Sequence, residues 1–322
     1  MIRRAVICAA WALLGCDPNV LIGSLPDAAK PPEISWNSGA HAGNELKDFT
    51  DFANYRGRPI AVATVFPDRA RDWDGVVMPW PLDAMRGFAG TLVLSLPLYP
   101  EGQGYDNRAC AAGEYDSEWR KLGTNLSARG RANSILRLGW GWNDLEHEWR
   151  ADADLANWIT CFRRVVSAVR STLPGVRITW DFNPPGPPHV MTGDPYAAYP
   201  GDDYVDYVGF EVFDEYPPAP DAAAWDARCN TPAGLCRLMA FAREHGKRVG
   251  ISEWGVVTCG ASSGGDNPYF IQRTVETFDE NSDIMQYEAY FESGATEPCS
   301  DLGTGSPAPH AAERYRQLYR EP

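Results

Sequence analysis

Short hydrophobic runs alternate along the chain with longer stretches in which hydrophobic residues recur at helical spacing. Most of the runs are almost continuously apolar, which is typical of parallel strands that are buried on both faces. The pattern predicts strands at residues 33–38, 60–66, 91–98, 134–140, 177–182, 204–213, 247–253 and 284–291. It predicts helices at residues 116–129, 153–171, 232–245, 267–278 and 308–319.

Eight strands with intervening helices predict an α/β fold, namely a single (β/α)8 TIM barrel over residues 33–322. A doubly wound open sheet is the alternative. That fold usually carries a glycine-rich phosphate loop after its first strand, but residues 37–43 read NSGAHAG and lack the G-x-G-x-x-G fingerprint. In a barrel, the functional residues lie at the C-terminal ends of the strands.

The composition narrows the class of protein. Hydrophobic residues make up 44% and charged residues 22%, which is ordinary for a globular chain. The net charge of −14 and the lack of a Lys/Arg cluster argue against a nucleic-acid partner. The 12 Trp residues offer flat apolar faces, for which sugar rings are one use and core packing is the other.

The N-terminus resembles an export signal. Arg3 and Arg4 precede an apolar stretch at residues 5–15 that is too short to span a bilayer. The stretch ends in Leu-Leu-Gly-Cys, similar to a bacterial lipoprotein box in which Cys16 would carry lipid. We expect residues 1–16 to be a lipoprotein-type signal peptide and residues 17–32 a tether, with a plain secretion signal or a buried helix as alternatives. The protein would then be exported, as a cell-surface lipoprotein or a secreted protein, with a membrane contact only through this lipid.

Six cysteines follow the signal, an even number that fits up to three disulfides in an exported chain. Spacing suggests Cys229–Cys236 and Cys259–Cys299, which leaves Cys110–Cys161, among 15 possible pairings. The five His residues and the cysteines show no metal-ligand spacing, so we expect no metal site and no cofactor.

Glu253 ends the seventh predicted strand and is followed by Trp254 and Gly255. Alternation would place it on one strand face with Val249 and Ile251. A carboxylate at a barrel mouth beside an indole can act as a glycosidase nucleophile or as a general base. The structural alternative is a carboxylate that pairs with an arginine.

Three other strands carry polar residues at positions that the pattern predicts to be buried. Arg137 lies inside the fourth strand and Glu211 inside the sixth, so an interior ion pair is expected, with a catalytic role for Glu211 as the alternative. The fifth strand ends in Trp180, Asp181 and Asn183, which could form a sugar subsite or simply begin a loop.

The densest aromatic and acidic segment follows the fourth strand, at residues 139–149. Its members read GWGWNDLEHEW, in which the acidic residues and His147 suit either ligand binding or a solvated loop.

These segments resemble glycoside hydrolase family 26, whose best-known members are secreted endo-β-1,4-mannanases. The resemblance extends from about residue 34 to residue 291. Residues 137–143 match an Arg-x-x-His-Glu-x-Asn motif of the fourth strand, and residues 199–209 are similar to a Tyr-Pro-Gly-Asp segment that leads into the sixth strand. The resemblance places Glu253 at the nucleophile position of the family.

Two neighbouring positions depart from the family pattern. Gly141 stands where the family has its general acid/base glutamate, and Trp140 stands where it has histidine. A retaining mechanism needs two carboxyl groups. Asp144 or Glu146 could reach in from the loop, the glycine could be an introduced change that traps a ligand, or the protein could be a glycan binder that has lost catalysis.

The resemblance implies a retaining endo-glycosidase that hydrolyses β-1,4-mannan or a related polysaccharide, and that acts as a monomer. In this hypothesis Glu253 attacks the sugar while a set of neighbouring residues binds substrate: Arg137, Trp140, Trp142, Asn143, Trp180, Asp181, Glu211, Tyr216 and Trp254. Of these, Arg137, Asn143 and Glu211 would either position the nucleophile or form hydrogen bonds to sugar hydroxyls. The alternative is a catalytically inactive glycan-binding surface lipoprotein. A metal-dependent barrel hydrolase is a third class, which the few histidines disfavour.

Overall fold

The computed structural model describes residues 34–67, 72–78, 80–152, 154–184, 190–191, 193–294 and 298–321, which fold as one compact unit. The predicted signal peptide and tether lie outside the described residues. The strands are β1 Asn37–His41, β2 Val62–Val65, β3 Thr91–Leu96, β4 Ile135–Leu138, β5 Arg177–Trp180, β6 Tyr207–Val208, β7 Val212–Phe213, β8 Arg248–Gly255 and β9 Met285–Phe291. The α-helices are α1 Leu46–Arg56, α2 Trp73–Val77, α3 Pro81–Ala84, α4 Asn107–Ala112, α5 Asp116–Ala128, α6 Leu155–Thr172, α7 Ala222–Cys229, α8 Leu235–Glu244, α9 Pro268–Glu280 and α10 Pro309–Tyr319, and η1 Pro195–Ala198 is a 3-10 turn.

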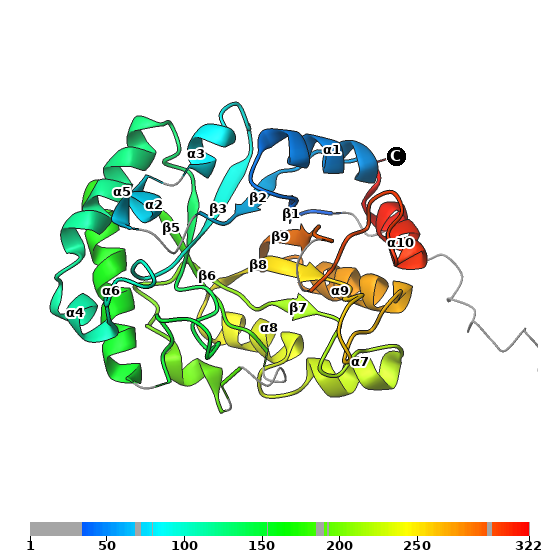
Figure 1. Cartoon of the computed structure of the whole chain (residues 1–322). Helices are drawn as coiled ribbons and strands as arrows, with labels where there is room; N and C mark the ends of the chain where they lie inside the picture. The colour runs from blue at the N-terminus through cyan, green and yellow to red at the C-terminus, as the bar shows by residue number, and fades with distance from the viewer. Residues whose placement is uncertain are drawn as a thin grey trace, which may run out of the picture. The chain divides into compact units, whose positions relative to one another are not determined.

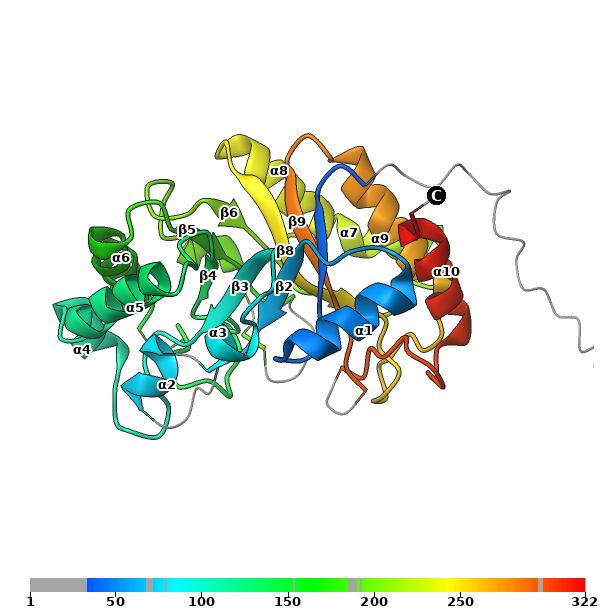
Figure 2. The same cartoon turned by 90° about the horizontal axis from the view of Figure 1, so that it is seen from above.

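Within the described residues, the strands form one parallel sheet in the order β6-β5-β4-β3-β2-β1-β9-β8-β7, and the pairing of β6 with β8 closes it. The pieces β6 and β7 both pair with β8 and act together as the sixth strand of the barrel. Helices surround the strands (Figures 1 and 2). The predicted (β/α)8 barrel is therefore confirmed.

The two ends of the barrel interior differ in chemistry. Near the N-terminal ends of the strands, Val62, Val93, Ile135 and Tyr287 form a buried apolar cluster with Tyr207 packed against it. Further along β4, the interior side chain is Arg137. The apolar cluster closes one end of the barrel, so the polar groups gather toward the C-terminal end, where barrel sites form.

Helix α6 shows how the outer layer is attached. The Asp154 carboxylate accepts a hydrogen bond from the Asn157 amide at 3.3 Å and caps the helix. Its buried face consists of residues at helical spacing that face the sheet: Trp158, Phe162, Val165, Val166 and Val169. This helix was predicted, within two residues at each end.

Two differences from the predicted elements have physical causes. The first strand begins at Asn37 rather than at residue 33, and it contains Gly39 because a Cβ there would lie 1.8 Å from the Val62 carbonyl oxygen. Only glycine fits where the two strands approach this closely, so this part of β1 lacks the hydrophobic side chains by which a strand is recognised in the sequence. Helices α1, α2, α3, α4 and α7 were not predicted; α1 buries only Phe49, Phe52 and Arg56.

Among the described residues, the six cysteines form the three expected disulfides: Cys110–Cys161, Cys229–Cys236 and Cys259–Cys299. The first joins α4 to α6, and the last joins the segments that follow β8 and β9. Disulfides fit a protein from an oxidising compartment outside the cytoplasm.

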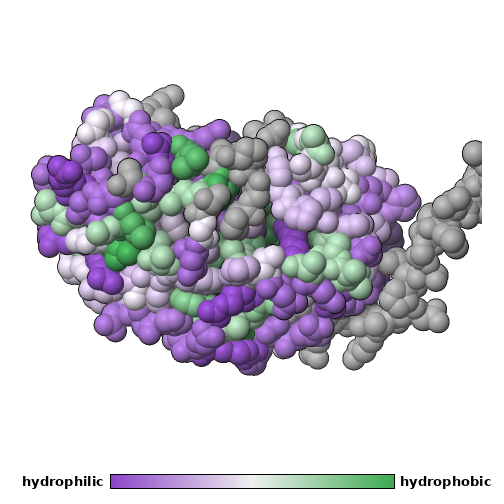
Figure 3. Space-filling model, turned by 90° about the horizontal axis from the view of Figure 1, so that it is seen from below, coloured by the Kyte–Doolittle hydropathy of each residue, from purple (hydrophilic) through white to green (hydrophobic). Residues whose placement is uncertain are grey.

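The face drawn in Figure 3 is mostly hydrophilic, and its hydrophobic residues gather in small separate patches. Within the described part of the chain, no helix has the length and apolarity that crossing a membrane requires.

Candidate active site

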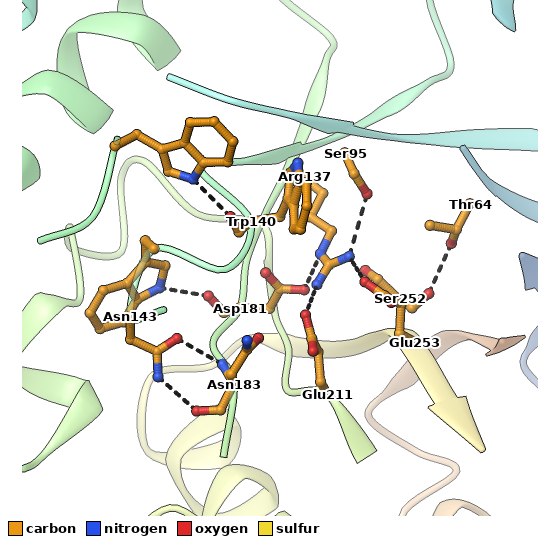
Figure 4. A network of polar contacts seen from close by, with 12 residues as sticks. Thr64, Ser95, Arg137, Trp140, Asn143, Asp181, Asn183, Glu211, Ser252 and Glu253 are labelled. Carbon is orange, nitrogen blue, oxygen red and sulfur yellow. Dashed lines mark hydrogen bonds and ion pairs between the residues drawn. The ribbon is translucent and has the colours of Figure 1, made fainter. Parts of the chain in front are cut away.

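The guanidinium of Arg137 lies at the centre of the candidate site (Figure 4). Its side chain is completely buried. Its Nε donates to Asp181 and its Nη1 donates to Glu253, while Nη2 lies 2.6 Å from Glu211 Oε1. A weaker contact joins Nη1 to Ser95 Oγ at 3.4 Å. The interior ion pair that the sequence predicted between Arg137 and Glu211 is present, and it includes two further carboxylates.

These side chains come from neighbouring strands at the same end of the barrel. Ser95 lies in β3 and Arg137 in β4, Asp181 directly follows β5, Glu211 lies between β6 and β7, and Glu253 lies in β8. Parallel strands bring their C-terminal ends to one edge, so residues far apart in sequence meet at the barrel mouth.

A β-bulge turns Glu253 into the barrel. Gly250 and Ser252 face Tyr287 inside it, since a Cβ on Gly250 would touch the Tyr287 ring and Ser252 Oγ lies 3.0 Å from Tyr287 Oη. Between Ile251 and Trp254, β8 has one residue more than β9, which shifts the alternation. The expectation that Val249 and Ile251 share a face with Glu253 is therefore wrong: both pack in the large outer core.

The same bulge points Trp254 outward. Its indole Nε1 lies 2.5 Å from Glu288 Oε2, and its ring packs edge-on against Phe278 of α9. Trp254 and Trp180 are 0% exposed and Trp142 is 2% exposed. A buried indole offers no face to a sugar ring, so the expected stacking role is corrected for these three residues, which serve the core.

The cluster has three carboxyl groups around one cation. Burial raises the pKa of Asp181 and raises that of Glu211 well above its ordinary value; the charge of Glu253 adds to both shifts, and Arg137 opposes them. Burial alone would lower the pKa of Arg137, but the carboxylates outweigh it and hold this pKa well above the usual range. The guanidinium therefore stays charged, whereas Asp181 and Glu211 hold a proton more readily than exposed carboxyl groups do.

Asn143 supports the cluster through the backbone of Asn183 (Figure 4). Its amide donates to the Asn183 carbonyl at 2.7 Å and accepts from the Asn183 amide at 2.9 Å. With its side-chain nitrogen turned toward Glu211, Asn183 donates to both carboxyl oxygens, at 2.7 and 2.9 Å. Asn143 is 3% exposed, so its place in the structure suits positioning rather than direct sugar contact.

Asp181 is equally enclosed. It is 1% exposed, its carboxylate pairs with Arg137, and its carbonyl accepts from Trp142 Nε1 at 2.7 Å. Both Arg137 and Asp181 are thus buried. Their burial fits the positioning role that was one of the two alternatives for Arg137, and it leaves little of the Asp181 side chain for a sugar to contact.

Aromatic rings surround the polar cluster. The Trp140 ring meets the edge of Phe66 at 5.2 Å, and the Arg137 guanidinium lies 6.0 Å from the Phe66 ring centre. His41 packs against Phe66 and stacks on Phe291. Trp140 and Phe66 are partly exposed, so they can offer apolar surface at the mouth.

His41 is a neutral member of this rim. Burial lowers its pKa to about 4, and the charge of Arg137 lowers it as well, although the hydrogen bond to the Thr64 carbonyl oxygen at 3.0 Å opposes the shift. At neutral pH the ring is uncharged, and its Nδ1 donates to that oxygen.

Gly141 has a φ of +62°, and a Cβ on it would lie 2.7 Å from two atoms of the His147 ring. The space that a side chain at this position would use is therefore filled by imidazole. His147 stacks on Trp149 at 4.6 Å, and its Nδ1 lies 3.6 Å from Glu101 Oε1.

The two predicted replacement acids lie in the turn that follows. The Asp144 side chain is buried and its Oδ1 accepts from the Glu146 amide at 2.9 Å, whereas the Glu146 side chain is exposed. Tyr216, half-buried in the segment after β7, remains a prediction as a substrate-binding residue.

Sequence reasoning missed Ser95, Phe66 and His41. Phe66 ends a predicted strand and Ser95 interrupts another, so both carried a positional signal. His41 lay inside the segment that was considered only for a phosphate loop. Among the described residues, no group of three or more His, Cys, Asp and Glu side chains is arranged to hold a metal ion.

A closed parallel barrel with polar groups at the C-terminal ends of its strands has the architecture in which TIM-barrel enzymes place their active sites. The same fold is found in solved structures of other proteins. The chain is similar to a Cellulomonas fimi endo-β-1,4-mannanase double mutant (TM-score 0.59, 15% identity, 84% of this chain and 66% of that one). It is also similar to the family 26 mannanase domain of Bacillus sp. JAMB-750 (TM-score 0.58, 15% identity, 88% and 90%) and to the family 26 domain of a Prevotella bryantii mannanase/glucanase (TM-score 0.57, 13% identity, 91% and 90%).

These identities establish a shared fold. No protein-family model and no curated protein matches the sequence.

Proposed function

We propose that this protein is a retaining glycoside hydrolase in which Glu253 is the nucleophile. The observation that carries the proposal is the placement of its carboxylate at the barrel mouth, paired with Arg137, with 8% of the side chain exposed beside partly exposed aromatic rings. The fold shared with the family 26 mannanases supports it.

The arrangement suits nucleophilic attack. Arg137 holds one oxygen of Glu253, so the other oxygen can attack the anomeric carbon of a bound sugar. A carboxylic acid protonates the leaving oxygen, and water then hydrolyses the glycosyl-enzyme. Trp140 and Phe66 supply apolar faces for sugar rings, and Glu211 has 13% of its side chain exposed and can reach sugar hydroxyls.

The proposed substrate is a polysaccharide, with β-1,4-mannan as the first candidate because the similar structures include endo-β-1,4-mannanases. We further propose that the protein acts as a monomer outside the cytoplasm. Lipid on Cys16 would anchor it, and Cys16→Ser should then move the protein from the membrane fraction to the soluble fraction.

The test is to incubate the full chain with a panel of mannans, glucans and xylans and to follow the product anomers by NMR. We expect cleavage with retained configuration, abolished in Glu253→Gln and unchanged in Glu244→Gln, an exposed glutamate of α8. Activity retained by Glu253→Gln, or inverted products, would contradict the proposal.

Gly141 favours a second candidate, a glycan-binding protein without turnover, because imidazole fills the space of a side chain at this position. In the same experiment, saturable oligosaccharide binding without cleavage of any polysaccharide would support this candidate.

A further inference from the structure

We propose that Glu211 is the carboxylic acid that protonates the leaving glycosidic oxygen. The inference rests on the proposed function, because it needs Glu253 as the nucleophile. It identifies a second carboxyl group in a site whose loop after β4 holds glycine at position 141.

The first argument is the distance between the carboxyl groups. Glu253 and Glu211 bind the two terminal nitrogens of one guanidinium, and the Glu211 contact measures 2.6 Å. Retaining glycosidases keep their two carboxyl groups about 5 Å apart. Because Glu253 and Glu211 contact the same guanidinium, their carboxyl groups lie in one small neighbourhood of the site, as such a pair requires.

The second argument is access. Of the three carboxyl groups in the cluster, Glu211 has the most exposed side chain, at 13%, compared with 8% for Glu253 and 1% for Asp181. A proton donor must reach the substrate, so Asp181 is excluded, and Glu211, which lies close to Glu253 (Figure 4), is the more accessible partner.

The third argument is the charge around Glu211. It faces Arg137 from β4, Asp181 from the end of β5 and Glu253 from β8, with the neutral amide of Asn183 beside it. One cation cannot neutralise three buried carboxylates, so the cluster favours holding a proton. Burial and the Glu253 charge both raise the pKa of Glu211, as a general acid requires.

The fourth argument is orientation. Asn183 and Arg137 fix the Glu211 carboxyl group, and Asn143 fixes the backbone of Asn183 with two hydrogen bonds. By comparison, the Asp144 carboxylate accepts a turn amide and the Glu146 side chain is exposed. Glu211 is thus the carboxyl group that the structure holds next to Glu253.

In the first step, a Glu253 oxygen bonds to the anomeric carbon, the bond to the glycosidic oxygen breaks, and that oxygen takes the Glu211 proton. In the second step, Glu211 accepts a proton from water as the water oxygen bonds to the anomeric carbon and releases Glu253. Both steps balance without a cofactor.

The experiment compares Glu211→Gln with the wild type on polysaccharide and on a 2,4-dinitrophenyl β-glycoside, whose leaving group needs no proton. On polysaccharide, we expect kcat/KM to fall by about 10²–10⁴-fold. On the aryl glycoside, the loss should be far smaller. The alkaline limb of the pH profile should disappear, and added azide should replace the base-activated water and yield a β-glycosyl azide.

Equal losses on both substrates without an azide product would show a structural role and overturn the inference. The inference would also be overturned if the loss on polysaccharide alone and the azide product were seen with Asp144→Asn or Glu146→Gln instead of with Glu211→Gln. In both cases Glu253 would remain the nucleophile. A wild type inactive on the polysaccharides and on the aryl glycoside would overturn the proposed function itself. Circular dichroism and Tm of each variant control for folding.

Discussion

The guanidinium of Arg137 has its hydrogen-bond partners on side chains that lie in or next to different strands. Because three of those partners are carboxyl groups with little exposure, the cation contributes both to the folded state and to the orientation of Glu253. At the scale of single residues, Arg137 determines how the carboxyl groups of the site are held, and Gly141 determines whether the loop after β4 can supply a side chain to it.

Replacing Arg137 by leucine should lower the free energy of unfolding by about 3–5 kcal/mol at pH 7, since it leaves buried carboxylates without a counter-ion. The loss should be smaller at pH 5, because the carboxyl groups can then take up protons. Urea unfolding at both pH values measures this. Equal stability of the variant and the wild type would show that the cluster is not held by the cation.

Restoring a side chain at position 141 should not be tolerated. Gly141→Ala places a Cβ 2.7 Å from the His147 ring at a φ of +62°, whereas Gly130→Ala has a similar φ of +67° but nothing within 4 Å of its Cβ. Both variants pay the backbone strain of about 1 kcal/mol. We expect a clearly larger loss of stability for Gly141→Ala in thermal unfolding, and equal losses would contradict the described position of His147.

At the scale of elements, the bulge in β8 separates Glu253 from its neighbour Trp254. Trp254→Phe should reduce stability by about 1–3 kcal/mol, because it removes the hydrogen bond to the buried Glu288, and it should leave KM nearly unchanged. Trp140→Ala, at the partly exposed rim, should raise KM instead. Unfolding experiments and steady-state kinetics of the two variants check this. A raised KM for Trp254→Phe would indicate that the Trp254 indole contacts the substrate, which would contradict the prediction.

The strands show what a sequence pattern can and cannot predict. Continuous apolar runs located the strands, and the buried charges of Arg137 and Glu211 were correctly expected to meet, since each needs a partner. The bulge at residues 252–253 has no hydrophobic signature, so alternation gave the wrong face for Val249 and Ile251. The tryptophans were misjudged for a related reason: the sequence reports an indole but not whether it faces the mouth or a helix.

At the scale of the whole molecule, a second carboxyl pair ties the end of the barrel to the C-terminal segment. Glu292, directly after β9, accepts amide hydrogen bonds from Leu302 at 2.9 Å and Gly303 at 3.1 Å. Burial raises the pKa of its carboxyl group to about 9, and its hydrogen bond with Asp301 adds to the shift.

The pKa of Glu292 predicts how stability depends on pH. Between the ordinary carboxyl pKa of 4.5 and about 9, the folded state holds a proton that the unfolded state has lost. This contribution is therefore complete below the unfolded pKa and is lost as the pH rises through 9, by up to about 1.4 kcal/mol for each pH unit. Glu292→Gln should flatten this part of a Tm-against-pH curve, and an unchanged slope would contradict a shared proton.

The central claim is that Glu253 forms a covalent bond with the sugar, and trapping tests it most directly. The wild type is incubated with a 2-deoxy-2-fluoro-β-glycosyl fluoride of the sugar that it cleaves, and its peptides are analysed by mass spectrometry. We predict a single glycosyl adduct on Glu253. An adduct on another residue, or rapid turnover of the natural substrate with no adduct at all, would contradict the account.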